Sequence, residues 1–535
     1  MLAEIRSRIF KDEIIKFHQG LNVVLGDNQG SNSIGKSTLL MILDFIFGGN
    51  TYILHNKDVI TKFGDHDFGC TFKFKKGTFY FIRSTKDPKL VYKSNQNFEK
   101  LEPIKLDSYR DFLKESYNLE SEQLKFRSAV STFSRVWGKN NYDVKRPLHN
   151  HHSEKNIETV IKLIKLFNEY DKIAKEDKEL SKLDESKKVL NKAGKLDLIP
   201  KISKRKYEKN LKEIGFLKGQ IEKLSKNAYS PLINLPDVVS DELVQLRVQK
   251  KKLIEEQDYY RSRLNRTTKK REISASINFE NLLEFFPNIN MKKLKTIEEF
   301  HNGINSILNK ELINARKEIK EKLTSLSDEI IEINQKLEKI LSQTEESNLF
   351  MDQIIEYSSE LKNLQSENDH YNNLQNIRTS IVAKTTLLNK IKDEIVNGLK
   401  GNINVQLTEI NNFIHENKRT APELELKYSN YDYKFFENTG TGKAYTNLII
   451  FDLAILRLTA LPFIIHDSFL FKNIEKEVVE RLITFYNSMS KQVFIAIDFI
   501  NIYNQETQNI LQANKVIQLT KNKLLTKIDW RNSSN

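Results

Sequence analysis

Apolar residues recur every seven positions in the middle of the chain. One segment carries two such series offset by four positions, at Leu312, Ile319, Leu326, Ile333 and Ile340 and at Leu323, Ile330 and Leu337. An earlier segment keeps the same three-and-four spacing, at Leu243, Leu246, Leu253, Tyr260 and Leu264. Lysine and glutamate fill most of the remaining positions, a pattern typical of a coiled coil. A long surface helix of a globular domain is the alternative, and two opposed segments favour the coiled coil.

The segment between the two heptad regions breaks this spacing. Residues 273–290 are rich in apolar residues and contain Pro287, so we expect the chain to turn back there. Residues 153–412 would then form an antiparallel coiled-coil arm with its apex near 273–296. Gly194, Pro200, Pro231 and Pro236 interrupt the rising half, which predicts kinks or an elbow in that half.

The two flanks, 1–152 and 413–535, hold most of the turn-forming residues of the chain. Short apolar runs between these residues predict strands at 21–26, 462–466 and 492–497, a hairpin over 67–83, and a closing pair of strands at 516–519 and 524–528. Both ends of the arm return to the same place, so we expect the flanks to pack together. The predicted fold is an α/β head made of an N-terminal and a C-terminal half.

A phosphate-binding sequence follows the first predicted strand. Residues 30–38 match G-x-x-x-x-G-K-[ST] at every fixed position and precede an apolar helix. The glycines let backbone amides surround an anion, and the helix N-terminus favours negative charge. Lys36 is expected at the β- and γ-phosphates, and Ser37 on Mg²⁺. The predicted contacts to ATP are Gly30, Asn32, Ser33, Ile34, Gly35, Lys36, Ser37 and Thr38.

A second motif of a P-loop ATPase lies near the C-terminus. Residues 462–467 form an apolar strand that ends in His466 and Asp467, and Asp467 is expected to hold Mg²⁺ directly or through water. The next residue is Ser468, which cannot act as a general base at neutral pH. Hydrolysis is therefore slow, or another residue is the base, with His466, Glu475 and Asp498 as candidates.

This order of motifs resembles the SMC/RecF/RecN-like branch of ABC ATPases, in which two half-heads meet at the base of a coiled coil. The segments Leu21–Gly26, Ser31–Ser37 and Pro462–Ser468 look most like a poorly characterised bacterial group of small SMC-like ATPases. Similar proteins are associated with systems that defend bacteria against phage or foreign DNA. The resemblance implies ATP hydrolysis by two heads that enclose two ATP molecules, and an absent Walker B glutamate would be a feature of the group.

The resemblance also implies a signature loop that closes on the γ-phosphate held by the opposite subunit. Thr439 and Gly440 would stand for the Ser-Gly of that signature, and Gly442 and Lys443 follow in the same loop before an apolar helix at 445–458. Thr441 departs from the second glycine of the family pattern. These residues are the expected contacts to the nucleotide of a second copy of the chain.

Two further motifs of the family have no clear match. Residues 126–135 occupy the region of its glutamine-bearing loop, and Asp498 stands near the place of its switch histidine. Arg127 and Arg135 lie about two turns apart on a predicted amphipathic helix. They contact nucleotide or DNA phosphate, or they are solvated, and the solvated arrangement is favoured.

Charge and composition narrow the classes of partner. The 85 Lys and Arg against 71 Asp and Glu give a net charge of +14, which is compatible with DNA. The single cysteine, Cys70, excludes a disulfide framework within the chain. The most apolar window, 447–471, contains charged residues and is expected to be buried core and no membrane span. No signal peptide is evident, so a cytoplasmic location is expected.

Three functions are compatible with these features. The favoured one is an ATP-gated sensor or clamp on double-stranded DNA, a homodimer that controls a separate effector protein. The alternative is a nucleotide-switched coiled-coil scaffold that assembles protein partners without touching DNA. A nuclease is the weakest hypothesis, because the polar group of Asp143, His149, His151 and His152 lacks clear nuclease spacing.

Overall fold

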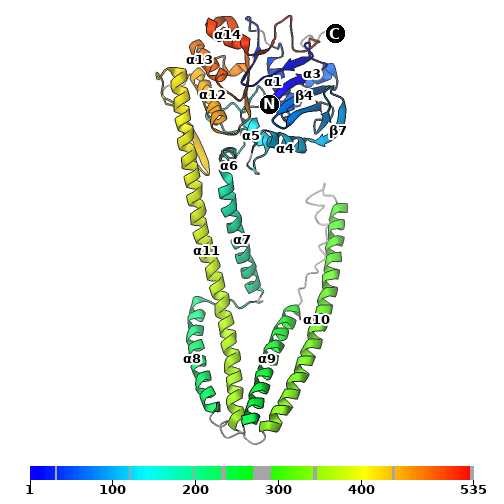
Figure 1. Cartoon of the computed structure of the whole chain (residues 1–535), viewed down its shortest axis with the longest axis vertical. Helices are drawn as coiled ribbons and strands as arrows, with labels where there is room; N and C mark the ends of the chain where they lie inside the picture. The colour runs from blue at the N-terminus through cyan, green and yellow to red at the C-terminus, as the bar shows by residue number, and fades with distance from the viewer. Residues whose placement is uncertain are drawn as a thin grey trace. The chain divides into compact units, whose positions relative to one another are not determined.

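The computed structural model describes residues 1–30, 33–119, 121, 123–196, 199–229, 237–268, 291–341, 346–436 and 440–529. The chain forms two compact units (Figure 1). The first unit joins residues 1–181 to residues 383–535, and the second contains residues 182–382. Among the described helices, none is long and apolar enough to cross a membrane.

A parallel sheet lies at the centre of the first unit. Its strand order is β13-β3-β12-β11-β8. Every residue of β3 and β12 is buried, as expected for a parallel sheet covered on both faces. The strands are β3 (Leu21–Leu25), β8 (Ser134–Arg135), β11 (Phe463–His466), β12 (Gln492–Ile497) and β13 (Lys515–Gln518). The carboxyl ends of β3, β11 and β12 therefore meet at one edge.

An antiparallel sheet forms the second layer of this unit, in the order β2-β1-β4-β5-β6-β7. The predicted hairpin is confirmed, because Phe74 pairs with Gly77 across the two-residue turn at Lys75 and Lys76. The strands are β1 (Leu2–Arg6), β2 (Ile14–Lys16), β4 (Asp67–Phe74), β5 (Gly77–Ser84), β6 (Leu90–Ser94) and β7 (Lys100–Lys105). This sheet is built from the N-terminal half of the sequence alone.

Aromatic packing joins the two sheets through the end of the first helix. The Phe47 ring contacts Phe72 of β4, Phe463 of β11 and Phe494 of β12. The N-terminal helices are α1 (Lys36–Ile46), α2 (Thr51–His55), α3 (Lys57–Phe63), α4 (Leu106–Ser116), α5 (Phe126–Thr132) and α6 (Asn156–Leu166). The C-terminal helices are α12 (Thr441–Leu458), α13 (Lys476–Asn487) and α14 (Gln505–Ala513), with 3₁₀ turns at Ser468–Leu470 and Ile500–Ile502.

The predicted closing pair of strands near the C-terminus is wrong. β13 pairs in parallel with β3, from the other half of the head. Residues 524–528 form no second strand and contribute a single bridge, from Thr526 to Phe10. Parallel pairing with a distant strand satisfies the backbone of β13, so a neighbouring strand is not needed.

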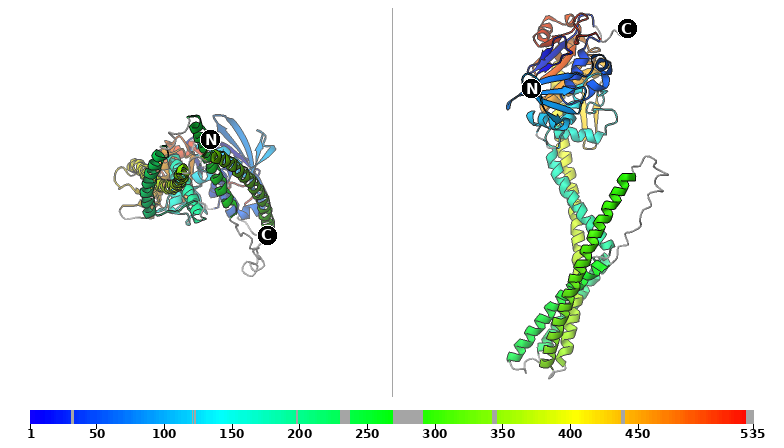
Figure 2. Two further views of the ribbon diagram at one scale, coloured as in Figure 1. Left: turned by 90° about the horizontal axis from the view of Figure 1, so that it is seen from below. Right: turned by 90° about the vertical axis from the view of Figure 1, so that its right-hand side faces the viewer.

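Two helices, α7 (Tyr170–Lys195) and α11 (Glu346–His415), belong partly to the first unit and partly to the second. Their portions in the first unit run side by side (Figure 2). Lys384 of α11 forms ion pairs with Glu176 and Glu179 of α7 at 2.7 and 2.6 Å. A small hairpin of β9 (Glu423–Lys427) and β10 (Asn430–Lys434) packs on the end of α11, where the Asn404 side chain bonds the backbone of Leu424.

The second unit contains the heptad segments as paired helices. α9 (Asp237–Thr268) lies against α10 (Met291–Leu341), and Ile333 and Leu337 pack on Leu246 and Leu253. α8 (Lys204–Tyr229) lies against the first half of α11, where Tyr207 stacks on Tyr371. The predicted heptad packing is thus confirmed at Leu246, Leu253, Ile333 and Leu337. The side chains of Leu243, Leu312 and Ile340 lie outside the described residues.

The rising half of the arm is interrupted around Pro200, as predicted, because α7 ends at Lys195 and α8 begins at Lys204. Pro231, Pro236 and residues 342–345 lie outside the described residues. Most of the predicted apex, 273–290, lies outside the described residues, and 291–296 are helical.

Candidate nucleotide site

The predicted phosphate loop connects a buried strand to a helix N-terminus. β3 ends at Leu25, and α1 begins at Lys36 after Gly35, whose φ of 106° is accessible to glycine and costly for other residues. A Cβ on Gly35 would lie 2.4 Å from the Leu525 side chain. Leu525 also donates its backbone N–H to the Ile34 carbonyl at 3.2 Å. The C-terminal segment therefore braces the loop from one side.

Ser37 and Asp467 meet at the carboxyl edge of the parallel sheet. The Ser37 hydroxyl donates a hydrogen bond to Asp467 Oδ1 at 2.9 Å. The other carboxylate oxygen accepts from the Trp137 backbone N–H at 3.2 Å, and Oδ1 also accepts from the Ser468 N–H at 2.7 Å. Asp467 is fully buried, which raises its pKa, while these hydrogen bonds and Lys36 oppose the shift. The structure thus brings the two predicted magnesium ligands together.

Lys36 is held by an aspartate from a third strand end. Its ammonium lies 2.9 Å from Asp498 Oδ1, and the two side chains are 7% and 11% exposed. Burial raises the pKa of Asp498, and the contact with Lys36 opposes this shift. The pair lies at the edge where β3 and β12 end side by side.

The remaining loop residues occupy varied environments. Ile34 is buried, Ser33 is exposed with a φ of 58°, and the Thr38 hydroxyl faces Asn56 at 3.5 Å. The predicted contacts Asn32 and Thr439 lie outside the described residues. The Thr38 hydroxyl therefore forms a hydrogen bond within the protein. Among Ser33, Ile34 and Thr38, Ser33 is the residue exposed to solvent.

His466 and Glu475 do not lie at the phosphate loop as candidate bases. His466 is fully buried, with Nδ1 bonded to Tyr486 Oη at 2.6 Å and Nε2 to Asp452 Oδ2 at 3.0 Å. Successive side chains of a strand point to opposite faces of the sheet, so the His466 and Asp467 side chains point in opposite directions. Glu475 pairs with Arg419 at 2.8 Å beside the signature-like loop. The Ser468 hydroxyl lies 3.5 Å from Asp467 Oδ1.

The signature-like loop borders a polar cavity at the N-terminus of α12. The cavity measures about 440 Å³ and shares no residue with the phosphate loop. A Cβ on Gly442 would lie 2.1 Å from the Asn473 carbonyl oxygen, so only glycine fits there without a shift. Lys443 donates to the Phe436 carbonyl at 2.8 Å. The lining residues are Arg419, Gly440, Thr441, Gly442, Lys443, Thr446, Asn473, Ile474, Glu475 and Val478.

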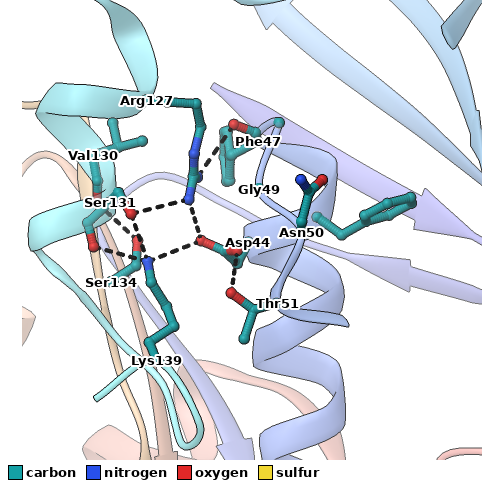
Figure 3. A network of polar contacts seen from close by, with 12 residues as sticks. Asp44, Phe47, Gly49, Asn50, Thr51, Arg127, Val130, Ser131, Ser134 and Lys139 are labelled. Carbon is teal, nitrogen blue, oxygen red and sulfur yellow. Dashed lines mark hydrogen bonds and ion pairs between the residues drawn. The ribbon is translucent and has the colours of Figure 1, made fainter. Parts of the chain in front are cut away.

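Arg127 and Arg135 are not solvated, which corrects the sequence-based expectation. Arg127 lies on α5 and forms an ion pair of 2.8 Å with Asp44, a fully buried residue of α1 (Figure 3). Lys139 contacts the same carboxylate at 3.3 Å, and Thr51 donates to it at 2.8 Å. Burial by itself would raise the pKa of Asp44, but Arg127 and Lys139 outweigh it and hold that pKa below its ordinary value. Burial also lowers the pKa of Lys139 to about 8.

Arg135 connects the strand of Asp467 to the helix of the signature-like loop. It lies in β8, after α5 has ended, and both it and Asp452 of α12 are fully buried. Its guanidinium bonds both Asp452 oxygens, at 2.8 and 2.7 Å. The same Asp452 carboxylate contacts His466, next to Asp467. One buried network therefore links β8, β11 and α12.

Three of the four residues considered for a nuclease form separate structural contacts. His149 bonds Tyr431 Oη at 2.7 Å, His151 bonds Ser153, and Asp143 accepts from the Lys145 N–H. In the part of the chain that the structure describes, there is no group of three or more His, Cys, Asp or Glu that could hold a metal ion. The observed contacts give the nuclease hypothesis no support.

Two contacts of the site were missed by sequence reasoning. The Trp137 N–H acts through the backbone, so no side-chain motif marks it. Leu525 reaches Gly35 from a segment 490 positions away, and its apolar side chain reads as ordinary core.

Comparisons with known proteins place these features in context. Residues 406–528 match a family described as an uncharacterised protein conserved in bacteria (DUF2326). No protein with a curated description matches the sequence. Similar solved structures include the Smc head domain with a coiled coil and joint from Pyrococcus yayanosii, at 15% identity and a TM-score of 0.41, over 97% of this chain and 94% of that one.

Two further similar structures contain a partner protein. The Smc head domain with an extended coiled coil bound to the C-terminal domain of ScpA, from Pyrococcus furiosus, is 11% identical with a TM-score of 0.33, over 96% of this chain and 91% of that one. The Smc head bound to the C-winged helix domain of ScpA is 11% identical with a TM-score of 0.34, at the same coverage. The chain is thus similar, at low identity, to heads of SMC proteins.

Proposed function

We propose that this chain is an ATPase whose head binds ATP with Mg²⁺ and hydrolyses it slowly. The observation that carries the proposal is the 2.9 Å hydrogen bond from Ser37 to Asp467, residues 430 positions apart in the sequence. A phosphate-loop hydroxyl and a strand-end aspartate are the two protein oxygens that hold Mg²⁺ in P-loop ATPases. Lys36 follows the loop glycine directly and lies beside the same strand ends.

The donor set suits a magnesium ion bound with nucleotide phosphates. Ser37 and Asp467 offer a hydroxyl and a carboxylate, and Mg²⁺ prefers oxygen ligands. When bound, the ion would neutralise phosphate charge. Trp137 and Ser468 hold the Asp467 carboxylate through their backbone N–H groups, so the ligand keeps its orientation before Mg²⁺ arrives. The N-terminus of α1 adds amide donors and a favourable dipole for the phosphates.

We expect hydrolysis to be slow because of the residues that stand near Asp467 in the sequence. Ser468 is a poor proton acceptor, His466 is turned away, and Glu475 is paired with Arg419. A water molecule at the γ-phosphate would therefore lack a strong base from these residues. Positioning and electrostatics still contribute to phosphoryl transfer without such a base.

We further propose that two copies of the head enclose the nucleotide. The cavity at Gly440 to Lys443 opens at a helix N-terminus and is lined by Arg419 and Lys443, a chemistry suited to a phosphate. It shares no residue with the phosphate loop, so it would serve the nucleotide of a second copy. Head pairing would then move the arms, as a DNA clamp or a switch for an effector requires. A defence role remains an expectation from the sequence resemblance.

A scaffold without DNA binding is the second candidate. The paired helices of the arm, which bury Ile333 and Leu337 against α9, support it, because such an arm can position partner proteins. The two candidates differ in one measurable property. DNA binding through phosphate contacts would weaken steeply as salt concentration rises.

Replacement of Lys36 tests the ATPase proposal. We expect Lys36→Ala to weaken binding of a fluorescent ATP analogue by at least about tenfold and to abolish turnover, because the phosphates lose their point charge. Lys57→Ala, at an exposed lysine of α3, is the matched control and should bind as the wild type does. Equal binding by the wild type and Lys36→Ala would refute the proposal.

Turnover with and without double-stranded DNA separates the two candidates. Stimulation by DNA that disappears in Lys36→Ala would support the clamp. ATP binding without any DNA affinity at low salt would support the scaffold.

A further inference from the structure

Asp498 occupies a position between the two motifs of the proposed nucleotide site. It directly follows β12, and β12 lies between β3, which leads into the phosphate loop, and β11, which leads to Asp467. Its carboxylate lies 2.9 Å from Lys36 Nζ, and both side chains are largely buried. The ammonium that would bind phosphate is thus already neutralised by an oxyanion of the protein.

The phosphate loop is shaped to receive this carboxylate. A Cβ on Gly26 would lie 1.9 Å from Asp498 Oδ1 and 3.1 Å from Lys36 Cδ. Glycine at position 26 therefore makes room for the ion pair. The ring of the next residue, Phe499, fills the space beside Gly30, where a Cβ would lie 2.1 Å from the ring.

The backbone of Phe499 is strained to make these contacts. Its φ and ψ of 55° and 47° lie in the left-handed region, which is costly for a bulky residue. Phe499 donates its N–H to the Asp27 carbonyl at 3.3 Å, and Asn501 donates to the Asn28 side chain at 3.2 Å. Such strain persists where surrounding contacts enforce it, and it is concentrated at functional sites.

We propose that Asp498 is an internal stand-in for nucleotide phosphate: it holds Lys36 until a nucleotide binds and displaces it. Asp498 to Asn501 then act as a latch on residues 26–30 and on Lys36. This inference rests on the proposed nucleotide site and adds a residue that sets its affinity. The displaced latch would release the strained backbone at Phe499, so the latch senses whether the site is filled.

The direction of the effect follows from charge. Lys36 has three N–H donors, so Asp498 and the β- and γ-phosphates would compete for them. A carboxylate that stays near bound ATP would repel it, because like charges in a largely buried site interact strongly. Asp498 therefore lowers the affinity for ATP, although it neutralises the charge of Lys36.

Neutral variants of Asp498 test the latch in the full-length protein. We expect Asp498→Asn to bind a fluorescent ATP analogue about tenfold more tightly than the wild type, which is the effect of removing one like charge. Asp498→Ser removes the same charge with a smaller side chain and should act in the same direction. Asp107→Asn, at an 88% exposed side chain on α4, controls for net charge and should leave the affinity unchanged.

The outcomes separate the latch from the nucleotide site itself. Tighter binding by both Asp498 variants, lost again when Lys36→Ala is added, supports the latch. Unchanged or weaker binding by folded Asp498 variants overturns it while the nucleotide site stands. Failure of the wild type to bind ATP would overturn the nucleotide site and the latch with it.

Discussion

At the scale of single residues, buried charges define how this head is held together. Asp44, Arg135 and Asp452 have no exposed side-chain surface, and each is paired with an opposite charge. Removing a charge from water costs several kcal/mol unless a partner compensates. The partners come from distant parts of the chain, so these pairs fix how the segment 126–139 joins α1 and α12.

Asp44→Asn should destabilise the head by about 3 kcal/mol in the free energy of unfolding. The amide keeps the shape of the side chain but leaves Arg127 and Lys139 buried without a counter-charge. Urea denaturation followed by circular dichroism measures the change. Asp107→Asn, at an exposed carboxylate, should change stability by less than about 0.5 kcal/mol.

The loss of stability in Asp44→Asn should also depend on pH. The native pKa of Asp44 is below its ordinary value because Arg127 and Lys139 outweigh the effect of burial. Its contribution to stability is therefore complete above the unfolded pKa, about 3.9, and is lost as pH falls below it. The stability gap between wild type and Asp44→Asn should shrink between pH 7 and pH 3. A constant gap would contradict the assigned pairing.

At the scale of elements, heptad periodicity predicts which positions of a helix are buried. Heptad spacing predicted the buried positions of α10 correctly, at Ile319, Leu326, Ile333 and Leu337. Continuous apolar runs also predicted strands correctly. The pairing partner of β13 was predicted wrongly, because parallel pairing with a distant strand leaves no turn signal in the local sequence.

Two isoleucines on α10 provide a matched test of the arm. Ile333 is 9% exposed and packs on α9, whereas Ile331 is 53% exposed. Ile333→Ala should destabilise the α9–α10 pair by about 2–3 kcal/mol through lost burial, and Ile331→Ala by less than about 0.5 kcal/mol. Native-state hydrogen exchange of peptides from both helices measures this. Equal protection in the two variants would contradict the observed packing.

At the scale of the whole molecule, the sequence predicted the residues of the candidate site better than it predicted the ion pairs around the site. Gly35, Lys36, Ser37 and Asp467 were predicted from motif and strand context, and the structure brings the last two into direct contact. Arg127 and Arg135 were misread, because their partners are 83 and 317 positions away. Long-range ion pairs leave no local pattern, so sequence spacing alone could not distinguish a buried arginine from a solvated one.

Gly442→Ala should prevent head pairing without removing ATP binding. Its Cβ would collide with the Asn473 carbonyl and displace the loop at the start of α12, whereas the phosphate loop keeps its own contacts. Light scattering with a non-hydrolysable ATP analogue should give a dimer for wild type and a monomer for the variant. Gly398→Ala has open space around its Cβ and should dimerise normally. Dimerisation of Gly442→Ala would exclude this loop from the interface.

The central sheet has a consequence for how the protein is made. β3 is synthesised near the start of the chain, yet its two neighbours, β12 and β13, come from near its end. At 5–20 residues per second, the ribosome needs on the order of a minute to supply them. During that time β3 lacks both of its neighbouring strands, and its apolar residues would be a target for chaperones. The proposed ATP site also needs Asp467, so it would be complete only after most of the chain has been made.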